Sequence, residues 1–299
     1  MKILVTGSDG FIGSNMLNYL TEKNISAYGW SRKTSIFNNI RSIEMENMDE
    51  VMNELNYLKP DVIIHCAGSA DVGKSVQYPE TDYVGNVTLT HNLLFAMHKL
   101  NLKNCRFIYL SSAAVYGNPK QLPITENADI NPLSPYALHK EMCESICMYM
   151  HKNYELDIKI LRIFSAYGEG LKKQIFWDMY KKVTETGYLK MLGTGNESRD
   201  YINIQDLMNA IYLISMNAPK NELIYNVANG KETTIKDVVK LFDLELGVKE
   251  DKIIFSGIEN EGNPLNWCAD ISKLKTLGYE QKVSLQEGIK NYIKWIERV

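Results

Sequence analysis

The sequence lacks the features that mark metalloproteins, membrane proteins and disulfide-bonded secreted proteins. Its five cysteines form no Cys-x-x-Cys pair, and its five histidines show no ligand spacing. No apolar run reaches the length of a membrane span. Met1-Lys2 leads directly into an apolar segment, so no secretory signal is expected before the fold. We therefore expect a reduced, cytoplasmic protein without a bound metal.

The sequence also carries little net charge and has no internal repeats. The net charge is −3, which argues against broad electrostatic binding to nucleic acid or to an anionic membrane. No repeat, low-complexity tract or long linker interrupts the 299 residues. With 45% hydrophobic and 23% charged residues, the chain has an ordinary globular composition. Its length fits one large α/β domain with an appended lobe, or two domains.

A glycine-rich loop follows the first apolar run. Residues 2–6 predict a buried strand, and residues 11–23 show helical apolar spacing. Between them, Gly7 permits a tight turn, Gly10 lets the backbone approach a pyrophosphate, and Gly13 allows close helix–strand packing. Strand, glycine loop and helix form the context of a dinucleotide fingerprint, although three glycines could merely punctuate a turn. The expected cofactor contacts in this loop are Gly7, Asp9, Gly10, Phe11, Ile12 and Gly13.

The end of the second predicted strand, residues 26–30, bears on the choice of cofactor. An acidic residue there would bond the ribose 2′-hydroxyl and favour NAD. This chain has Ser31, Arg32 and Lys33 instead, one hydroxyl and two cations suited to a 2′-phosphate. We therefore expect NADP, with NAD as the alternative if these residues are only a solvated basic loop.

Strands and helices alternate through the first half of the chain. The pattern predicts strands at 62–65, 107–111 and 158–164, and helices at 84–100 and 136–154. This alternation predicts an α/β fold, a doubly wound parallel (Rossmann) sheet with right-handed crossovers. We assign residues 1–167 to this NAD(P)-binding domain, with a return segment near 201–227.

The carboxyl-terminal part has a different pattern. Helical spacing appears at 171–186, 203–216, 234–246 and 284–298, a short strand is predicted at 225–227, and 187–200 reads as glycine-rich and irregular. We expect residues 168–299 to form mainly a smaller substrate-binding lobe. Open α/β sheets bind ligands at their carboxyl edge, so a cleft between the lobes is the expected substrate site.

Tyr136 and Lys140 are four residues apart on a predicted helix, so they share one face. A neighbouring ammonium favours the phenolate and is expected to lower the pKa of Tyr136, which suits general acid–base chemistry at a carbinol or carbonyl carbon. Ser112 ends a buried strand, where its hydroxyl could bond a reacting oxygen; alternation turns Ser111 elsewhere. Each feature alone has a plain structural alternative, a surface pair or a strand-ending serine.

Two further segments are candidates for cofactor binding. Cys66, Ala67 and Gly68 end another strand with small side chains, which suits an adenine or ribose passing close by, or simply a tight strand exit. Asn86 is placed at the start of a helix, where it could contact the cofactor or act only as a cap.

Taken together, these motifs resemble the extended short-chain dehydrogenase/reductases, in the branch of nucleotide-sugar epimerases, dehydratases and reductases. The resemblance runs from Met1 to about Trp295 and includes a later Arg199-Asp200-Tyr201 segment. It implies a Ser112–Tyr136–Lys140 triad, a nucleoside-diphosphate sugar as substrate, and Arg199 on the substrate diphosphate. An ion pair of Arg199 with Asp200 or Asp206 is the structural alternative for that arginine.

Several residues depart from the family pattern and concern the substrate pocket. Ala113-Ala114 stands where the dehydratases carry an Asp-Glu pair, which argues against a 4,6-dehydratase. Ser165 replaces the usual asparagine, and Asn260 and Glu261 occupy the place of a second diphosphate arginine. We retain Ser112, Ala113, Ser165 and Arg199 as expected substrate contacts. Lys172, Lys173 and Gln174 could supply further phosphate contacts or form a solvated helix start.

The sequence favours a reductase that transfers hydride from NADPH to carbon 4 of a 4-keto sugar nucleotide, such as a 4-keto-6-deoxy one. The alternative is a nucleotide-sugar 4-epimerase that keeps NAD tightly bound, and a non-enzymatic NADP-binding protein is less expected. The resemblance also implies a homodimer through the two long helices. Their apolar faces could equally be ordinary core: Leu93, Leu94, Met97, Met142, Ile146 and Met150.

Overall fold

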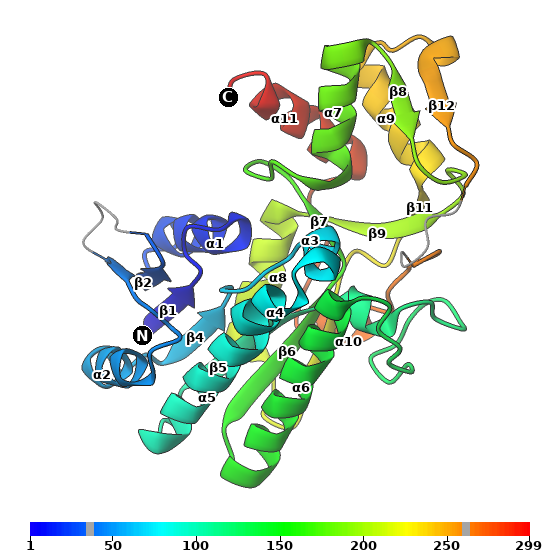
Figure 1. Ribbon diagram of the computed structural model, residues 1–299. Coiled ribbons are helices and arrows are strands. Elements are labelled where there is room, and N and C mark those ends of the chain that lie inside the picture. The colour runs from blue at the N-terminus through cyan, green and yellow to red at the C-terminus, as the bar shows by residue number, and fades with distance from the viewer. Residues whose placement is uncertain (34–38, 259–263) are drawn as a thin grey trace. The chain divides into compact units, whose positions relative to one another are not determined.

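The computed structural model describes residues 1–33, 39–258 and 264–299 (Figure 1). The chain divides into two compact units, each assembled from several segments. The first unit comprises residues 1–117, 130–163 and 211–225. The second comprises residues 118–129, 164–210 and 226–299.

A seven-stranded sheet forms the centre of the first unit, in the order β10-β6-β5-β4-β1-β2-β3. Its strands are β1 (Lys2–Thr6), β2 (Ser26–Ser31), β3 (Ile40–Ser42), β4 (Val62–His65), β5 (Arg106–Ser112), β6 (Asp157–Ile163) and β10 (Ile224–Val227). All pairings from β3 across to β6 are parallel. The predicted doubly wound parallel sheet is therefore confirmed.

Helices cover both faces of this sheet (Figure 1). They are α1 (Phe11–Glu22), α2 (Met48–Leu58), α3 (Val72–Gln77), α4 (Pro79–Tyr83), α5 (Leu89–Lys99), α6 (Pro135–Tyr154) and α8 (Ile204–Asn217). On one face α5 packs between α2 and α6. On the other face α1 contacts the end of α8, where the rings of Tyr19 and Tyr212 have centroids 5.9 Å apart.

The helix predicted at 84–100 is interrupted. A π-helical segment, η1 (Val84–Thr88), separates α4 from α5. Within it the Asn86 amide donates to the Asp82 carbonyl at 3.1 Å, and the Thr90 hydroxyl donates to the Asn86 carbonyl at 2.7 Å. Side chains that bond helical carbonyls disturb the regular ladder, which explains the wider turn. The prediction that Asn86 starts a helix was wrong, because it lies inside this turn.

The apolar faces of α5 and α6 belong to the core of the first unit. Leu93, Leu94, Met97 and Met150 are buried, and Met142 and Ile146 are partly buried against the same cluster. Burying such side chains stabilises each by about 1.5–3 kcal/mol relative to exposure. These residues therefore serve the core, and the homodimer stays a prediction.

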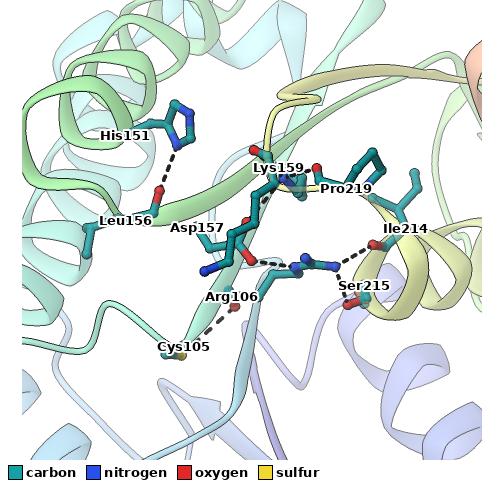
Figure 2. A network of polar contacts seen from close by, with 10 residues as sticks. Cys105, Arg106, His151, Leu156, Asp157, Lys159, Ile214, Ser215 and Pro219 are labelled. Carbon is teal, nitrogen blue, oxygen red and sulfur yellow. Dashed lines mark hydrogen bonds and ion pairs between the residues drawn. The ribbon is translucent and has the colours of Figure 1, made fainter.

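The amino ends of β5 and β6 carry a network of buried charges (Figure 2). Asp157 accepts from Arg106 Nε at 2.9 Å and forms an ion pair with Lys159 Nζ at 3.1 Å. Arg106 also donates to the Ser215 carbonyl at 3.1 Å, and Lys159 donates to the Pro219 carbonyl at 2.8 Å. The network thereby fastens the end of α8 and the turn after it to the two central strands.

The described part of the second unit contains two smaller sheets, several helices and the first half of α8. The strands are β7 (Ser165–Tyr167), β9 (Ser198–Asn203) and β11 (Glu232–Thr234) in one sheet, and β8 (Leu189–Met191) with β12 (Ile253–Phe255) in the other. The helices are α7 (Gln174–Thr186), α9 (Ile235–Leu246), α10 (Ser272–Thr276) and α11 (Leu285–Ile296). Phe176 is central to the core, with ring centroids 4.9 Å from Tyr167 and 5.8 Å from Tyr292.

The segment 187–200, predicted to be irregular, includes β8 and the start of β9. Gly187 ends α7, whereas Gly193 and Gly195 lie in the turn between the two strands, where the Thr194 and Gly195 amides both donate to the Glu197 carboxylate at 2.8 Å. A carboxylate that closes a turn in this way leaves no periodic signal in the sequence. Among the described residues, no helix is long and apolar enough to cross a membrane.

Candidate active site

The glycine loop joins β1 to α1 in a conformation that larger residues would not tolerate. Gly7 has a φ of +63°, and a Cβ at this position would lie 2.6 Å from the Ala67 amide nitrogen. A Cβ on Gly13 would overlap the Gly7 carbonyl oxygen. Both glycines are thus required by close backbone approach, within the loop and against the residues that follow β4.

The amino terminus of α1 is open to a ligand. Its N-cap residue, Gly10, supplies no side-chain cap, and the first turn contains no acidic residue. The unpaired N–H groups of a helix start, together with its dipole, attract phosphate oxygens. Asp9 is exposed beside this turn, and Phe11 and Ile12 are half-buried in it. The loop therefore fits the pyrophosphate of a dinucleotide.

His65, which sequence reasoning passed over, fixes the exit of β4. Its Nδ1 lies 2.7 Å from the Thr6 hydroxyl, and its Nε2 lies 3.2 Å from the Thr90 hydroxyl. The Thr6 hydroxyl in turn accepts the Ala67 amide at 3.2 Å. Burial, aided by the charge of Lys140, lowers the pKa of His65 to about 3, so the imidazole is neutral. It connects β1, β4 and α5 below the expected cofactor loop, where Cys66 and Gly68 also lie.

The three residues expected to select NADP differ in their surroundings. Ser31 is buried, and its hydroxyl donates to the Lys33 carbonyl at 2.5 Å. The side chains of Arg32 and Lys33 are exposed, and neither forms an ion pair within the described part of the chain. The serine is therefore engaged locally, while the two cations face solvent.

Helix α6 begins where the sequence supplies its start signals. The Ser134 hydroxyl accepts the Ala137 amide at 3.2 Å, and Pro135 occupies the first helical position. The helix then turns a stripe of buried side chains toward the sheet, which comprises Tyr136, Lys140, Cys143, Glu144 and Cys147. Tyr136 and Lys140 thus lie on its inner face.

Ser112 and Tyr136 meet at the carboxyl end of β5. Hydrogen bonding by the Ser112 side chain opposes the rise that burial causes in the pKa of Tyr136, and the Ser112 hydroxyl accepts the Ala114 amide at 3.2 Å. Ser111 turns the other way and donates to Glu144 at 2.5 Å. The alternation of the strand therefore directs Ser112, rather than Ser111, to the phenol. Ala113 follows with its side chain fully buried.

The Lys140 ammonium donates to the Leu110 carbonyl at 2.9 Å and lies 5.8 Å from the centroid of the Tyr136 ring. Its pKa is lowered by burial. Asn86 and Gly68 lie beside it, since a Cβ on Gly68 would be 2.8 Å from Asn86 Oδ1 and 3.7 Å from Lys140 Nζ. Three of the segments predicted to bind the cofactor thus come together here.

The expected effect of Lys140 on the phenol is not observed in the protein alone. Burial raises the pKa of Tyr136 to about 12, the hydrogen bond from Ser112 lowers it, and the charges of Asp82 and Cys143 raise it. Lys140 is not among these causes. The physical reason is geometric, because its ammonium is directed at the Leu110 carbonyl and burial of the phenol dominates.

A second group of buried polar residues supports this end of β5 and β6. Glu144 accepts from Arg162 Nε at 3.0 Å and from its NH2 group at 2.7 Å. The Arg162 NH1 group donates to the Tyr116 hydroxyl at 3.0 Å. With the bond from Ser111, these contacts tie α6 to both strands. The sequence carries no local signal for them, since the partners come from three separate segments.

Arg199, in the second unit, does not form the ion pairs considered from sequence. Its NH1 group donates to the carbonyls of Ser198 at 2.7 Å and Leu265 at 3.1 Å, and its guanidinium lies 5.3 Å from the Trp267 ring. Asp200 instead accepts the backbone amides of Asn229 and Ala269, and burial raises its pKa to about 6. Asp206 likewise accepts backbone amides, from Lys282 and Val283. A guanidinium held on one nitrogen and one face retains donors for a ligand.

The other residues predicted for the substrate belong to the second unit as well. Ser165 starts β7 and is half-buried beside Tyr201. Lys172 lies over two indole rings, 6.0 Å from Trp177 and 5.8 Å from Trp295, while Gln174 begins α7. Asn260 and Glu261 fall outside the described residues. Within the described part of the chain, no cluster of His, Cys, Asp and Glu could hold a metal ion.

Comparisons with known proteins agree with this geometry. The family described as "NAD dependent epimerase/dehydratase family" matches residues 3–228. A protein of Methanocaldococcus jannaschii, provisionally named UDP-glucose 4-epimerase, is 32% identical over 99% of this chain and 98% of its own length.

Two solved structures are similar over the whole chain. The UDP-glucose 4-epimerase of Thermotoga maritima, determined with UDP-glucose, has a TM-score of 0.90 and 27% identity, and covers 100% of this chain and 99% of its own. The UDP-glucuronic acid 4-epimerase of Bacillus cereus, determined with UDP-glucuronic acid and NAD, has a TM-score of 0.89, the same identity and the same coverage.

Proposed function

This chain belongs to the NAD dependent epimerase/dehydratase family, and from that premise we propose that it is a UDP-sugar 4-epimerase that uses bound NAD. Membership confirms the predicted branch of the extended short-chain dehydrogenase/reductases and an NAD(P)-dependent enzyme of nucleotide-sugar type. It does not support the favoured reductase, because the similar proteins named above are 4-epimerases. The alternative drawn from sequence is therefore the better one.

The observation that carries the proposal is the placement of Ser112 at the carboxyl end of β5, against which α6 packs with Tyr136 and Lys140 on its buried face. Tyr136 would take the proton of the sugar 4-hydroxyl and later return one to the oxygen of the epimeric alcohol. Ser112 would hold that oxygen by a hydrogen bond as its charge changes. When bound, the nicotinamide supplies a hydride acceptor that returns the hydride to carbon 4. Lys140 would hold the cofactor ribose and supply positive charge near the phenol.

For the cofactor, we propose NAD rather than NADP. The glycine loop and the open start of α1 would hold the pyrophosphate. Arg32 and Lys33 face solvent, while the Ser31 hydroxyl is bonded to a carbonyl, so none of the three is fixed in a phosphate site. The Bacillus cereus relative was determined with NAD. Because epimerisation would return the cofactor to its starting redox state, the cofactor could stay tightly bound through every cycle.

For the substrate, we propose a UDP-hexose or UDP-hexuronic acid, as in the two structural relatives. Arg199 would bind the diphosphate through the donors that its carbonyl contacts leave available. Ala113 supplies no acid or base, which keeps a 4,6-dehydratase disfavoured. A homodimer remains part of the proposal, although the six apolar residues first considered for it lie in the core.

The test is an assay of the purified protein with UDP-glucose, UDP-galactose and the two corresponding uronic acids, with no cofactor added. We expect one pair to interconvert to a mixture of 4-epimers, and we expect NAD to be released from the denatured protein. The matched control is Tyr136→Phe, which keeps the ring and removes the hydroxyl.

Two results would contradict the proposal. Net consumption of NADPH with a 4-keto sugar nucleotide, and no interconversion of any pair, would restore the reductase. Normal turnover by Tyr136→Phe would remove the assigned mechanism for either reaction.

A further inference from the structure

A buried pair outside the predicted triad, Asp82 on α4 and His139 on α6, connects α4 to the helix that carries the proposed catalytic phenol. His139 Nδ1 is 2.7 Å from Asp82 Oδ2, and the two side chains are 9% and 3% exposed. His139 is adjacent to Lys140 and one turn from Tyr136 on the same helix. Its ring also packs edge-on against Tyr83, at 5.5 Å between centroids. The pair therefore joins the segment before Asn86 to the helix that carries Tyr136.

The second oxygen of Asp82 makes the pair unusual. Asp82 Oδ1 is buried and has no hydrogen-bond partner among the described residues, and the same holds for Asn86 Oδ1 one turn later. A buried carboxylate with one contact is costly unless that contact carries positive charge. His139 is the group that contacts the other oxygen of Asp82, so the position of this carboxylate depends on helix α6.

The neighbouring helix α3 also contacts the start of α6, through Ser75. The Ser75 hydroxyl accepts the Tyr136 amide at 3.1 Å and donates to the Val72 carbonyl at 2.7 Å. Helices α3, α4 and η1 thus all pack against α6. A change in the Asp82–His139 contact would move Tyr136 relative to Asn86 and Ser112.

Other ionisable groups around the phenol do not duplicate the charge of Asp82. From β4, Cys66 and His65 face Lys140, and burial keeps both neutral. From β5, Tyr109 faces Tyr136, and its pKa is raised well above the ordinary value by burial.

On α6, burial raises the pKa of Cys143 and keeps the thiol protonated, and Lys140 donates to a carbonyl. Glu144 is neutralised by its two bonds to Arg162. Asp82 is therefore the carboxylate whose charge acts on Tyr136, and its effect is to disfavour the phenolate.

We propose that the buried Asp82–His139 contact is a positioning pair that holds the first turns of α6 and, with them, the catalytic phenol. Through this pair, α4 sets both the place and the electrostatic surroundings of Tyr136. This inference rests on the acid–base role proposed for Tyr136. Neither residue is assigned contact with the sugar or the cofactor.

The test compares two variants that alter the two sides of this contact. Asp82→Asn keeps an acceptor for the imidazole and removes the negative charge, so the phenolate becomes easier to form. The rising limb of kcat against pH is expected to move to lower pH by roughly 0.5–1 unit. His139→Gln keeps an N–H donor for Asp82 and leaves the carboxylate in place, so the limb is expected to stay at its wild-type pH. KM should change less than twofold in both variants.

The matched control is Asp157→Asn, which alters another buried ion pair of the same unit, at the amino ends of β5 and β6. It is expected to lower the thermal midpoint without moving the limb. A shift to lower pH in Asp82→Asn alone supports the proposal. A shift in both variants, or a limb that stays in place for Asp82→Asn, overturns it. Circular dichroism confirms that each variant is folded.

A measurement independent of turnover separates this proposal from the enzymatic one. The protein is labelled with 13C at the tyrosine phenol carbon, and the Tyr136 signal among the 18 tyrosines is identified by its loss in Tyr136→Phe. In Asp82→Asn this signal is expected to begin its titration at lower pH than in the wild type. If the wild type converts no UDP-sugar but the signal shifts as expected, the proposed function fails and the positioning pair stands. If turnover is normal and the signal does not shift, the reverse holds.

Discussion

The two ends of strands β5 and β6 each carry a cluster of buried charges, and the two clusters differ in how completely they are paired. At the amino ends, Asp157 accepts a hydrogen bond from Arg106 and pairs by charge with Lys159 through Oδ1, which makes no hydrogen bond within the described part of the chain, and both cations donate to carbonyls at or after the end of α8 (Figure 2). At the carboxyl ends, Asp82 and Asn86 each retain a buried oxygen without a partner among the described residues. Satisfied networks stabilise a fold, whereas buried polar atoms left open mark sites where a ligand or a proton is handled.

The two clusters also differ in how burial changes the pKa of their central groups. Around Lys159, desolvation lowers the pKa of the ammonium and the charge of Asp157 opposes that effect. Around Tyr136, desolvation raises the pKa of the phenol, and a neutral hydroxyl, that of Ser112, opposes it. The first cluster compensates its charges and the second leaves a perturbed acid, which is the condition expected of a catalytic group.

The largest expected effect would come from removing the perturbed acid. Tyr136→Phe is expected to lower kcat by roughly 10²–10⁴-fold, because a positioned acid–base group contributes that much. Its thermal midpoint should stay close to that of the wild type, since the buried ring is retained. Steady-state kinetics and a melting curve of the same preparation measure both. If Tyr136→Phe lowered the thermal midpoint as well as kcat, the carboxyl-end cluster would be structural in the same way as the amino-end cluster.

The opposite outcome is expected at the amino ends. Asp157→Asn should destabilise the fold by about 3 kcal/mol, because Arg106 and Lys159 would remain buried without their counter-charge. Turnover at a temperature well below the midpoint should stay within twofold of the wild type. Urea unfolding followed by circular dichroism gives the free energy of unfolding. A urea unfolding midpoint equal to that of the wild type would show that this network contributes specificity rather than stability.

A third prediction concerns acid stability and the neutral imidazole of His65. Its pKa is about 3 in the folded protein against 6.5 when unfolded, so the unfolded chain binds one more proton between these values. Stability from this group is therefore present above pH 6.5 and falls by about 1.4 kcal/mol per pH unit as pH drops toward 3. Urea midpoints between pH 4 and 7 should be less dependent on pH in His65→Gln. An equal dependence in both proteins would show that other groups govern acid unfolding.

The smallest effect is expected at the end of β2. Arg32→Ala should change the affinity for NAD by less than about threefold, because an exposed charge contributes little to binding. Affinity for NADP should be the weaker of the two before and after the change. Titration calorimetry on protein freed of its cofactor measures both. Tighter binding of NADP, lost in Arg32→Ala, would restore the original interpretation of Ser31-Arg32-Lys33.

Local sequence signals predicted the parts of the site that depend on neighbours along the chain. The glycine loop, the capped start of α6 and the four-residue spacing of Tyr136 and Lys140 are of this kind. Alternation along β5 also separated Ser112 from Ser111. The π-helical turn around Asn86 could not be foreseen, because it arises from side chains that bond carbonyls of their own helix.

The choice between NADP and NAD could not be made from the sequence for a different reason. Two cations after β2 are chemically suited to a 2′-phosphate, yet suitability does not show whether they are held in place. The structure leaves both side chains exposed, and the comparisons turned the proposal toward NAD. Exposed charges are weak evidence for specificity because solvent screens them.

By itself, the sequence determined the family and the parallel sheet and located the residues of the proposed catalytic triad, because periodicity and short motifs depend on residues close together in the chain. Only the tertiary structure decided which buried charges are paired. Asp82 meets His139 and Glu144 meets Arg162 across long stretches of chain, and no local pattern encodes such distances. Burial, which sets the pKa of Tyr136 and of His65, likewise depends on everything packed around a side chain.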